Sequence, residues 1–359
     1  MTLVGWSLMR RIRLAVALLV TTVAVAASGC TDLLVPASPE DHNIEDFEAA
    51  WTFIDSLYPM FTEKGIDWDS VYAWYRPRAE TAHGDEGHQI LHDLVATLRD
   101  GHAYYQTVGG GVVFPFVSPR LRRDRPTFSP YVVRRYVRGE LKLAANRKLE
   151  YGFLEGNLGY LRLPTFDPGY LLDDFAAVMR DLSDTEALVI DVRNNVGGKL
   201  KNVAGVVRWF VDSTMRWSDG FSQREILKDI EPPIEPADPA PGYGGPVVVL
   251  INGGARSAGD IFPELMRQLP RVTLVGDTTA GMACQDASDL EGDLRLPGGN
   301  SIHIPTECLR RYDAVPIERF GVPADLRVTQ TEDDVRAGRD PQLERAIALL
   351  RASGAHDLF

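Results

Sequence analysis

One serine in this chain occupies a position where a nucleophile can be activated. Ser257 follows the strand-like run Val247–Ile251 and the glycine pair Gly253-Gly254, and a segment with helical apolar spacing begins directly after it. A serine at the start of a helix lies beside backbone N–H groups that have no partner within the helix. Such groups stabilise the oxyanion formed when a serine attacks a carbonyl carbon. The local pattern predicts a nucleophile, and its alternative is a serine that only caps the helix.

Further motifs lie in a fixed order along the chain and together resemble peptidase family S41, the C-terminal processing or tail-specific proteases. The serine segment is one of them. The others are Leu98-Arg99-Asp100-Gly101-His102, the run LVIDVRNNVGG from Leu188 to Gly198, the run ERFGVPAD from Glu318 to Asp325, and Asp340-Pro341-Gln342-Leu343 at the start of the last helix. The resemblance covers residues from about 44 to 352.

The chain departs from the family pattern at three places. Met282 stands where the tail-specific members carry a catalytic lysine, and a thioether cannot accept a proton as an amine does. Too few residues separate Tyr105 from Tyr151 for the family's PDZ domain, and Pro323 is displaced by one position in its motif. The sequence is therefore more similar to the PDZ-lacking branch that includes the tricorn core, whose members use a histidine base.

The resemblance implies a site of the Ser-His-Glu type. An imidazole titrates near neutral pH and suits a general base, while a carboxylate behind it stabilises the imidazolium. Each residue also has a structural alternative: a helix cap for His102, a surface acid for Glu318, and a helix-start acid for Asp260. The implied roles are Ser257 as nucleophile, His102 as base, Glu318 as its orienting group, the N–H groups of Gly198 and Ala258 with Gly197 as oxyanion hole, and Asp260 in support.

Periodicity predicts an α/β fold. Helical spacing occurs at residues 44–61, 67–75 and 88–98, and buried strands alternate with helices from Gly159 onward. The resemblance implies a ClpP/crotonase-like core of stacked strands and helices after a small helical N-terminal domain. The expected boundaries are a lipoprotein signal peptide at 1–29, a linker at 30–40, the helical domain at 41–105, a β-rich connection without a PDZ domain at 106–150, the catalytic core at 151–352 and a tail at 353–359. A β pattern is expected from Tyr131 to Leu143, and the proline-rich stretch from Glu231 to Gly245 is expected as a loop, with a lid over the site as one option.

The first residues have the pattern of an export signal. Three arginines precede a short apolar run from Leu14 to Ala27, and Ala27-Ser28-Gly29-Cys30 resembles a bacterial lipobox. Cys30 is thus the expected lipidation site, with an ordinary secretory signal as the alternative. The expected location is the bacterial cell envelope, lipid-anchored and exposed to the periplasm or exterior.

The remaining cysteines and the overall charge narrow the partners. In an oxidising compartment Cys284 and Cys308 can pair, and two buried thiols are the alternative. A net charge of −12 argues against nucleic acid as a partner. No cofactor is expected, and no metal either, because His88 and His92 lack a third strong ligand. Seven arginines between Arg120 and Arg138 form a basic cluster that is either a solvated face or a contact for an acidic substrate or terminal carboxylate.

Three classes of function fit these features. The first is a serine endopeptidase that hydrolyses peptide bonds of proteins or peptides through an acyl-enzyme. The second is a catalytically silent relative that binds peptides or hydrophobic ligands. The third is a crotonase-like acyl transfer enzyme, which the histidine motif and the segment from Glu318 to Asp325 disfavour.

Overall fold

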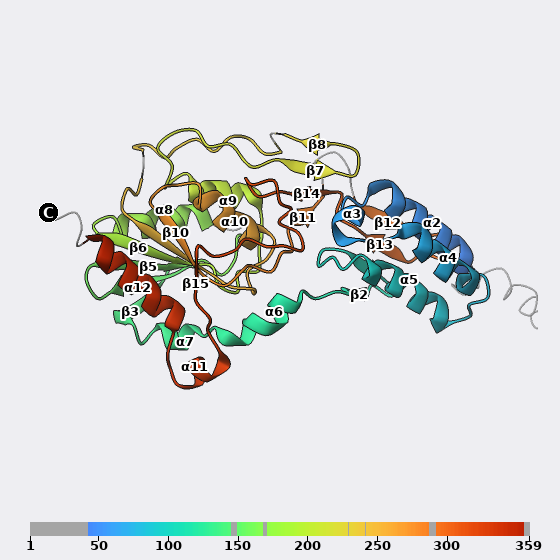
Figure 1. Cartoon of the computed structure of the whole chain (residues 1–359), viewed down its shortest axis with the longest axis horizontal. Helices are drawn as coiled ribbons and strands as arrows, with labels where there is room; N and C mark the ends of the chain where they lie inside the picture. Colours follow the sequence, from blue (N-terminus) through green and yellow to red (C-terminus); the bar gives the residue numbers. More distant parts are fainter. Residues whose placement is uncertain are drawn as a thin grey trace, which may run out of the picture.

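The computed structural model describes residues 42–144, 149–167, 171–228, 230–240, 242–286 and 292–354, and Figure 1 shows their arrangement. A helical N-terminal part (blue) lies beside an α/β core. The core is built on a seven-stranded sheet in the order β15-β10-β9-β6-β5-β4-β3. Its strands are β3 (Val137–Leu143), β4 (Glu150–Leu154), β5 (Leu158–Arg162), β6 (Ala187–Asp191), β9 (Val247–Ile251), β10 (Val272–Gly276) and β15 (Leu326–Arg327).

The central strands are parallel and are buried on both faces. β5, β6, β9, β10 and β15 pair in parallel, and β4 joins β5 and β3 in antiparallel register. Strands that are covered on both faces have near-continuous apolar sequences, and β6 and β9 are buried at every residue. The α/β fold expected from the sequence is confirmed.

Alternate residues of each strand face two separate helical layers. In β9, Val249 packs with α8 (Leu171–Asp181), α9 (Leu200–Val207) and α10 (Ala258–Met266), whereas Val248 and Leu250 pack with α12 (Pro341–Gly354). α11 (Glu332–Arg336) precedes α12 and carries a capping box on Thr331. Among the described residues, no helix combines the length and apolarity needed to cross a bilayer.

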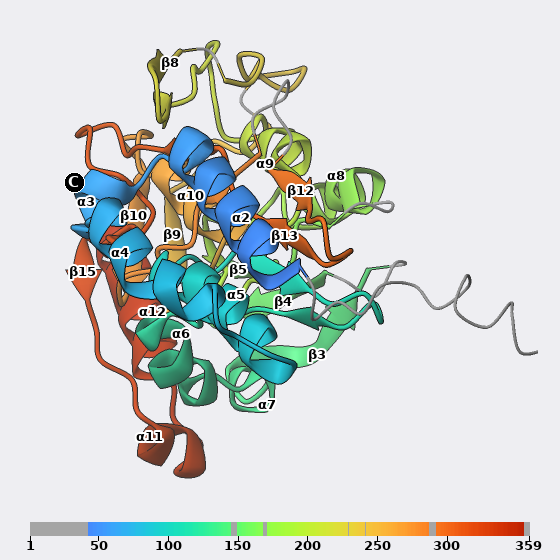
Figure 2. The same cartoon turned by 90° about the vertical axis from the view of Figure 1, so that its right-hand side faces the viewer.

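The N-terminal part recruits a hairpin from the far end of the sequence. Its helices are α2 (Asn43–Leu57), α3 (Phe61–Lys64), α4 (Trp68–Ala79) and α5 (Asp85–Thr97), which lie in front of the core in the view of Figure 2. β1 (Tyr104–Gln106) pairs with β2 (Val112–Val113) on one side and β13 (Ser301–His303) on the other, and β13 pairs with β12 (Asp293–Arg295). The hairpin side chains Leu296, Ile302 and Ile304 share a core with these helices.

Two expectations for the segments around the core need correction. The β pattern expected from Tyr131 begins only at Val137, because Pro130 starts the short helix α7 (Pro130–Val133), which follows α6 (Pro119–Asp124) and the 3₁₀ turn η2 (Arg125–Thr127). The proline-rich stretch is a loop but not a lid over Ser257. The N–H groups of Ala237 and Tyr243 in this loop donate to the carbonyls of Arg208 and Trp209. These two residues follow the C-terminal end of α9, whereas Gly198 precedes its N-terminal end.

A third, small sheet lies beside the core. Its order is β11-β14-β7-β8, formed by β7 (Gly220–Ser222), β8 (Ile226–Leu227), β11 (Cys284–Gln285) and β14 (Glu307–Leu309). Cys284 and Cys308 face each other across β11 and β14 and are joined by a disulfide.

Candidate active site

Ser257 lies in a tight turn between β9 and α10. Its backbone has φ 56° and ψ −128°, a conformation that costs a residue with a Cβ about 1–3 kcal/mol. The turn is held because the Ser257 N–H donates to the carbonyl of Met282 at 2.7 Å, while the Ser257 carbonyl accepts the N–H of Asp260 at 2.8 Å. Strained backbone of this kind is typical of functional sites, and here it places the hydroxyl at the start of α10.

Two backbone N–H groups near Ser257 donate to no acceptor among the described residues. They belong to Ala258, the first residue of α10, and to Gly198, which precedes α9. A Cβ on Gly197 would lie 2.6 Å from the Ser257 Cβ, and a Cβ on Gly198 would lie 2.1 Å from the Phe166 carbonyl carbon. The glycine pair is therefore required for the close approach of this loop to the serine and to residue 166.

Met282 links the serine segment to the histidine motif. Its carbonyl accepts the Ser257 N–H, and its side chain is buried against Gly101, where a Cβ would lie 1.9 Å from the Met282 Cε. Gly101 is therefore the residue that makes room for the methionine. Met282 thus makes an apolar contact with Gly101, the residue that precedes His102 in the sequence.

His102 has the electrostatic environment of a neutral imidazole. Its backbone N–H donates to Asp100 Oδ1 at 2.9 Å, and its ring Nδ1 is buried without a hydrogen-bond partner among the described residues. Burial lowers the pKa of His102; the Asp100 carboxylate opposes this, and His303, Arg256 and Lys64 lower it further. A neutral imidazole at neutral pH is the form that can accept a proton from a hydroxyl.

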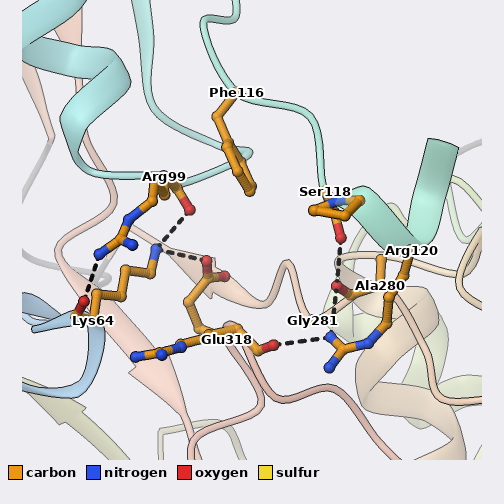
Figure 3. Close-up of a pocket in the computed structure, with 10 residues that line it drawn as sticks. Lys64, Arg99, Phe116, Ser118, Arg120, Ala280, Gly281 and Glu318 are labelled. Carbon is orange, nitrogen blue, oxygen red and sulfur yellow. Dashed lines mark hydrogen bonds and ion pairs between the residues drawn. The ribbon is translucent and has the colours of Figure 1, made fainter.

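A buried lysine that the sequence analysis missed connects the N-terminal helices with the candidate site. Lys64, at the end of α3, donates from Nζ to Glu318 Oε1 at 2.8 Å (Figure 3) and to Asp100 Oδ2 at 3.2 Å. Nζ also donates to the Tyr58 hydroxyl at 2.7 Å, and that hydroxyl donates to Asp100 Oδ2 at 2.9 Å. A lysine before a glycine at a helix end is an ordinary pattern, so nothing in the local sequence marks Lys64.

The pKa values of the two acids of this cluster shift in opposite directions. Burial alone would raise the pKa of Asp100, but Lys64, His102 and the His102 N–H together hold it below its ordinary value. Burial and the Asp100 charge raise the pKa of Glu318 to about 8, against the opposing effects of Lys64 and the Ala283 N–H. Burial keeps the Tyr58 hydroxyl protonated by raising its pKa well above the ordinary value.

The raised pKa of Glu318 predicts a specific dependence of stability on pH. The folded protein holds a proton on Glu318 up to about pH 8, whereas an unfolded glutamic acid loses it near its ordinary pKa of 4.5. The folded state binds more protons in that window, so its free energy of unfolding falls as pH rises from about 4.5 to about 8. Glu318→Gln removes this contribution. The Tm of the natural chain should therefore fall more steeply than that of Glu318→Gln between pH 5 and pH 8 in thermal melts, and parallel curves would contradict the assignment.

Asp260 and Glu318 hold the segment that runs past the serine. Asp260 accepts the N–H groups of Gly281 and Met282 at 2.9 and 3.0 Å, and Glu318 Oε2 accepts that of Ala283 at 3.0 Å. Burial raises the pKa of Asp260 to about 6, against hydrogen bonds from Thr279, Met282, Gly281 and Ser257. Asp260 thus has a structural role at the start of α10 and contacts no other candidate catalytic side chain through a hydrogen bond among the described residues.

The structure does not join Glu318 to His102 directly. Both Glu318 oxygens already accept hydrogen bonds, from Lys64 and from Ala283, and Asp100 is the acid that contacts the histidine residue. No hydrogen bond joins Ser257 to His102 among the described residues. Cys30, the expected lipidation site, lies outside the described residues.

Two groups of ligand-type side chains converge in the described part of the chain. Asp100, Cys284 and Glu318 form one, but Cys284 is in the disulfide and cannot ligate as a thiolate. Asp286, Asp293 and His303 form the other, where His303 Nδ1 lies 3.2 Å from Asp293 Oδ1 and Nε2 lies 3.7 Å from Asp286 Oδ1. His88 and His92 contact Tyr105 and Asp93 instead of a shared ligand.

Comparisons with known proteins point to one family. The model of peptidase family S41 matches residues 157–328, and that of the tricorn protease C1 domain matches residues 39–96. Tricorn protease homolog 1 of Streptomyces coelicolor is 34% identical over 204 residues, 55% of this chain and 17% of that protein. Carboxy-terminal processing protease CtpB of Bacillus subtilis is 26% identical over 235 residues, 61% of this chain and 48% of that protein.

The solved structures agree with these relatives. A putative peptidase from Parabacteroides merdae superposes with a TM-score of 0.72 at 25% identity, covering 88% of this chain and 97% of that one. The chain spans only about a fifth of the length of the tricorn relatives it matches, between 17% and 22% of the first three. The two family models, the relatives and the shared fold place this chain, through its core at residues 157–328, in peptidase family S41.

Proposed function

We propose that this protein is a serine peptidase that hydrolyses peptide bonds through an acyl-enzyme on Ser257. One observation carries the proposal. Ser257 occupies a strained turn at the start of α10, next to Ala258 and close to the Gly197-Gly198 loop, and the N–H groups of Gly198 and Ala258 have no acceptor among the described residues. A helix cap requires neither the strain nor the second N–H. Both are expected for a nucleophile that must place an oxyanion between two donors.

In this proposal His102 is the general base. The imidazole takes the proton of the Ser257 hydroxyl as Oγ bonds to the substrate carbonyl carbon, and the carbonyl oxygen becomes an oxyanion held by the two N–H groups. The imidazolium then protonates the departing amine as the C–N bond breaks. A water molecule, deprotonated in turn by the imidazole, attacks the acyl-enzyme and releases the carboxylate product and free Ser257.

In this proposal Asp100, and not Glu318, is the carboxylate that supports His102. Asp100 contacts the His102 backbone directly, and Glu318 shares Lys64 with Asp100. We assign Glu318 to positioning. Through Lys64 and Asp100 it holds the loop that carries His102, and through the Ala283 N–H it holds the segment that contains Met282. The negative charge of Asp100 stabilises the imidazolium formed during the reaction.

Hydrolysis of fluorescently quenched casein by the full chain tests the proposal. Ser257→Ala should reduce the rate to background, because no other group in the site replaces the nucleophile. Ser183→Ala, at an exposed serine after α8, is the matched control and should keep the natural rate. If Ser257→Ala cleaves as fast as the control, the nucleophile is wrong. If none of the proteins cleaves casein, the result favours the alternative of a silent peptide-binding relative.

The proposed location is the cell envelope, through a lipid on Cys30. The arginine-rich start, the apolar run and Ala27-Ser28-Gly29-Cys30 support it, as does the Cys284–Cys308 disulfide, which persists in oxidising compartments. Metabolic labelling with a tritiated fatty acid should mark the natural chain and not Cys30→Ser. Equal labelling of both would rule out this anchor.

A further inference from the structure

A cavity of about 350 Å³ lies beside Glu318, on the side of residues 280 and 281. Figure 3 shows it enclosed by Phe116 and Ser118 from the segment after β2, by Lys64 and Arg99 from the N-terminal part, and by Glu318 and Arg120 below. The segment from Ala280 to Met282 connects this cavity to the nucleophile, because Ala280 and Gly281 line it and the Met282 carbonyl holds Ser257.

The lining carries an excess of positive charge. Four cationic residues, Lys64, Arg99, Arg120 and Arg319, line the cavity together with one acid, Glu318. Figure 3 shows the Arg99 guanidinium directed away from the cavity, toward the Lys64 carbonyl. The Glu318 carboxylate is already satisfied by Lys64 and the Ala283 N–H. None of the three arginines forms an ion pair with an acid among the described residues; their guanidinium groups donate to the backbone carbonyls of Lys64, of Arg319 and of Glu63, respectively.

Nearby acids do not neutralise these arginines. The charges that act on Arg120 include Asp260, Asp124 and Asp277, and each has nearer partners. Asp260 accepts two backbone N–H groups, while Asp124 and Asp277 both pair with Arg123. Of the seven arginines in the basic cluster, Arg120 is the one that lines this cavity.

Two of the arginines occupy strained backbone. Arg99 has φ 48° and Arg319 has φ 68°, in the left-handed region that L-residues other than asparagine and aspartate rarely adopt. Arginine has no side-chain reason to prefer this conformation. The fold therefore accepts strain at two residues that line the same cavity.

We propose that this cavity binds a carboxylate of the peptide substrate, carried either at its C-terminus or on an acidic side chain. The inference rests on the proposed peptidase function for the identity of the ligand. A free inorganic anion would leave most of the volume empty, whereas Phe116, Pro119 and Ala280 offer apolar surface for the carbon atoms that carry a carboxylate. Guanidinium groups suit the charged end because they donate paired hydrogen bonds to a carboxylate.

Fluorescence anisotropy on the full chain with Ser257→Ala tests the inference without hydrolysis. Three fluorescein-labelled probes are compared: an alanine hexapeptide ending in leucine with a free carboxylate, the same peptide as its C-terminal amide, and the amide with one internal alanine replaced by aspartate. One acidic probe or both should bind at least about tenfold more tightly than the neutral amide, the size expected for one charge-assisted contact. The probe that gains affinity identifies the source of the carboxylate.

Arg120→Gln should abolish the preference for the acidic probe, and Arg120→Lys should keep part of it. Arg122→Gln, at an exposed arginine of the same helix that does not line the cavity, is the matched control and should change nothing. Salt provides a readout that needs no substitution at Arg120: binding of the acidic probe should weaken between about 50 and 500 mM NaCl, and that of the amide should not.

Three results would overturn the inference: equal affinity for neutral and acidic probes, no binding of any probe, or equal losses in Arg120→Gln and Arg122→Gln. These outcomes are separate from those of the proposed function. A chain that hydrolyses casein through Ser257 but shows no carboxylate preference keeps the peptidase function and loses only this cavity.

Discussion

His102→Ala should lower kcat by at least about 10³-fold while leaving the affinity for a peptide almost unchanged. The imidazole makes the serine hydroxyl nucleophilic and later supplies the proton to the leaving amine, so it acts in the transition state rather than in binding. His92→Ala is the matched control, because His92 lies on α5 beside Asp93, away from the candidate site. Steady-state kinetics with a fluorogenic peptide separate kcat from KM.

The pH profile provides a second readout for the same residue. Only the neutral imidazole accepts a proton, so kcat/KM should rise with pH through the pKa of His102. Burial lowers that pKa below the ordinary histidine value of 6.5, so the midpoint of the acid limb should lie below pH 6.5. In His102→Ala the residual activity should lose this limb. A limb that persists in the variant, or a kcat within a few fold of the control, would assign the base to another group.

Lys64→Met should destabilise the fold by about 3 kcal/mol or more. Among the described residues, the ammonium is the one cation that both Asp100 and Glu318 contact through hydrogen bonds, and its side chain is only 2% exposed. Removing it leaves the buried Asp100 carboxylate without a counter-charge, beside a Glu318 side chain whose pKa Lys64 otherwise lowers. Lys142→Met is the matched control: Lys142 pairs with Asp181 at 3.7 Å on the surface, and such exposed pairs contribute about 0–1 kcal/mol. Urea unfolding at pH 7 measures both.

A double variant shows whether the uncompensated charge is the cause. Adding Asp100→Asn to Lys64→Met removes the acid that is ionised at pH 7, so the double variant should recover part of the stability that the single variant loses. If the losses simply add, the effect of Lys64 comes from packing, and the proposed electrostatic link between the N-terminal helices and the site is wrong.

The core of the fold was predictable because its strands and motifs are local in sequence. β6 and β9 are continuous apolar runs, and Ser257 follows β9 within six residues, so periodicity and turn residues suffice to place them. The packing of the β12–β13 hairpin against α2 was not predictable, because that contact joins Asp46 to Gly298 across 252 positions, and no local pattern encodes such a distance.

The site was predictable only in part, for the same reason. Motifs identify Ser257, His102 and Glu318, but they do not say that Asp100, rather than Glu318, contacts the histidine residue. Lys64 has no motif at all, since its importance arises from a side chain that crosses 254 positions to reach Glu318. Met282 was identified as the absence of a base, whereas its packing on Gly101 required the structure.

Reaction with a fluorophosphonate, followed by mass spectrometry of the digested protein, tests the central claim most directly. The reagent forms a covalent bond with an activated serine and does not depend on knowing the substrate. We expect one adduct per chain on the peptide that contains Ser257 and no adduct in Ser257→Ala. In His102→Ala, labelling should be slower by orders of magnitude. An adduct on a different serine, or labelling of Ser257 at the natural rate in His102→Ala, would contradict it.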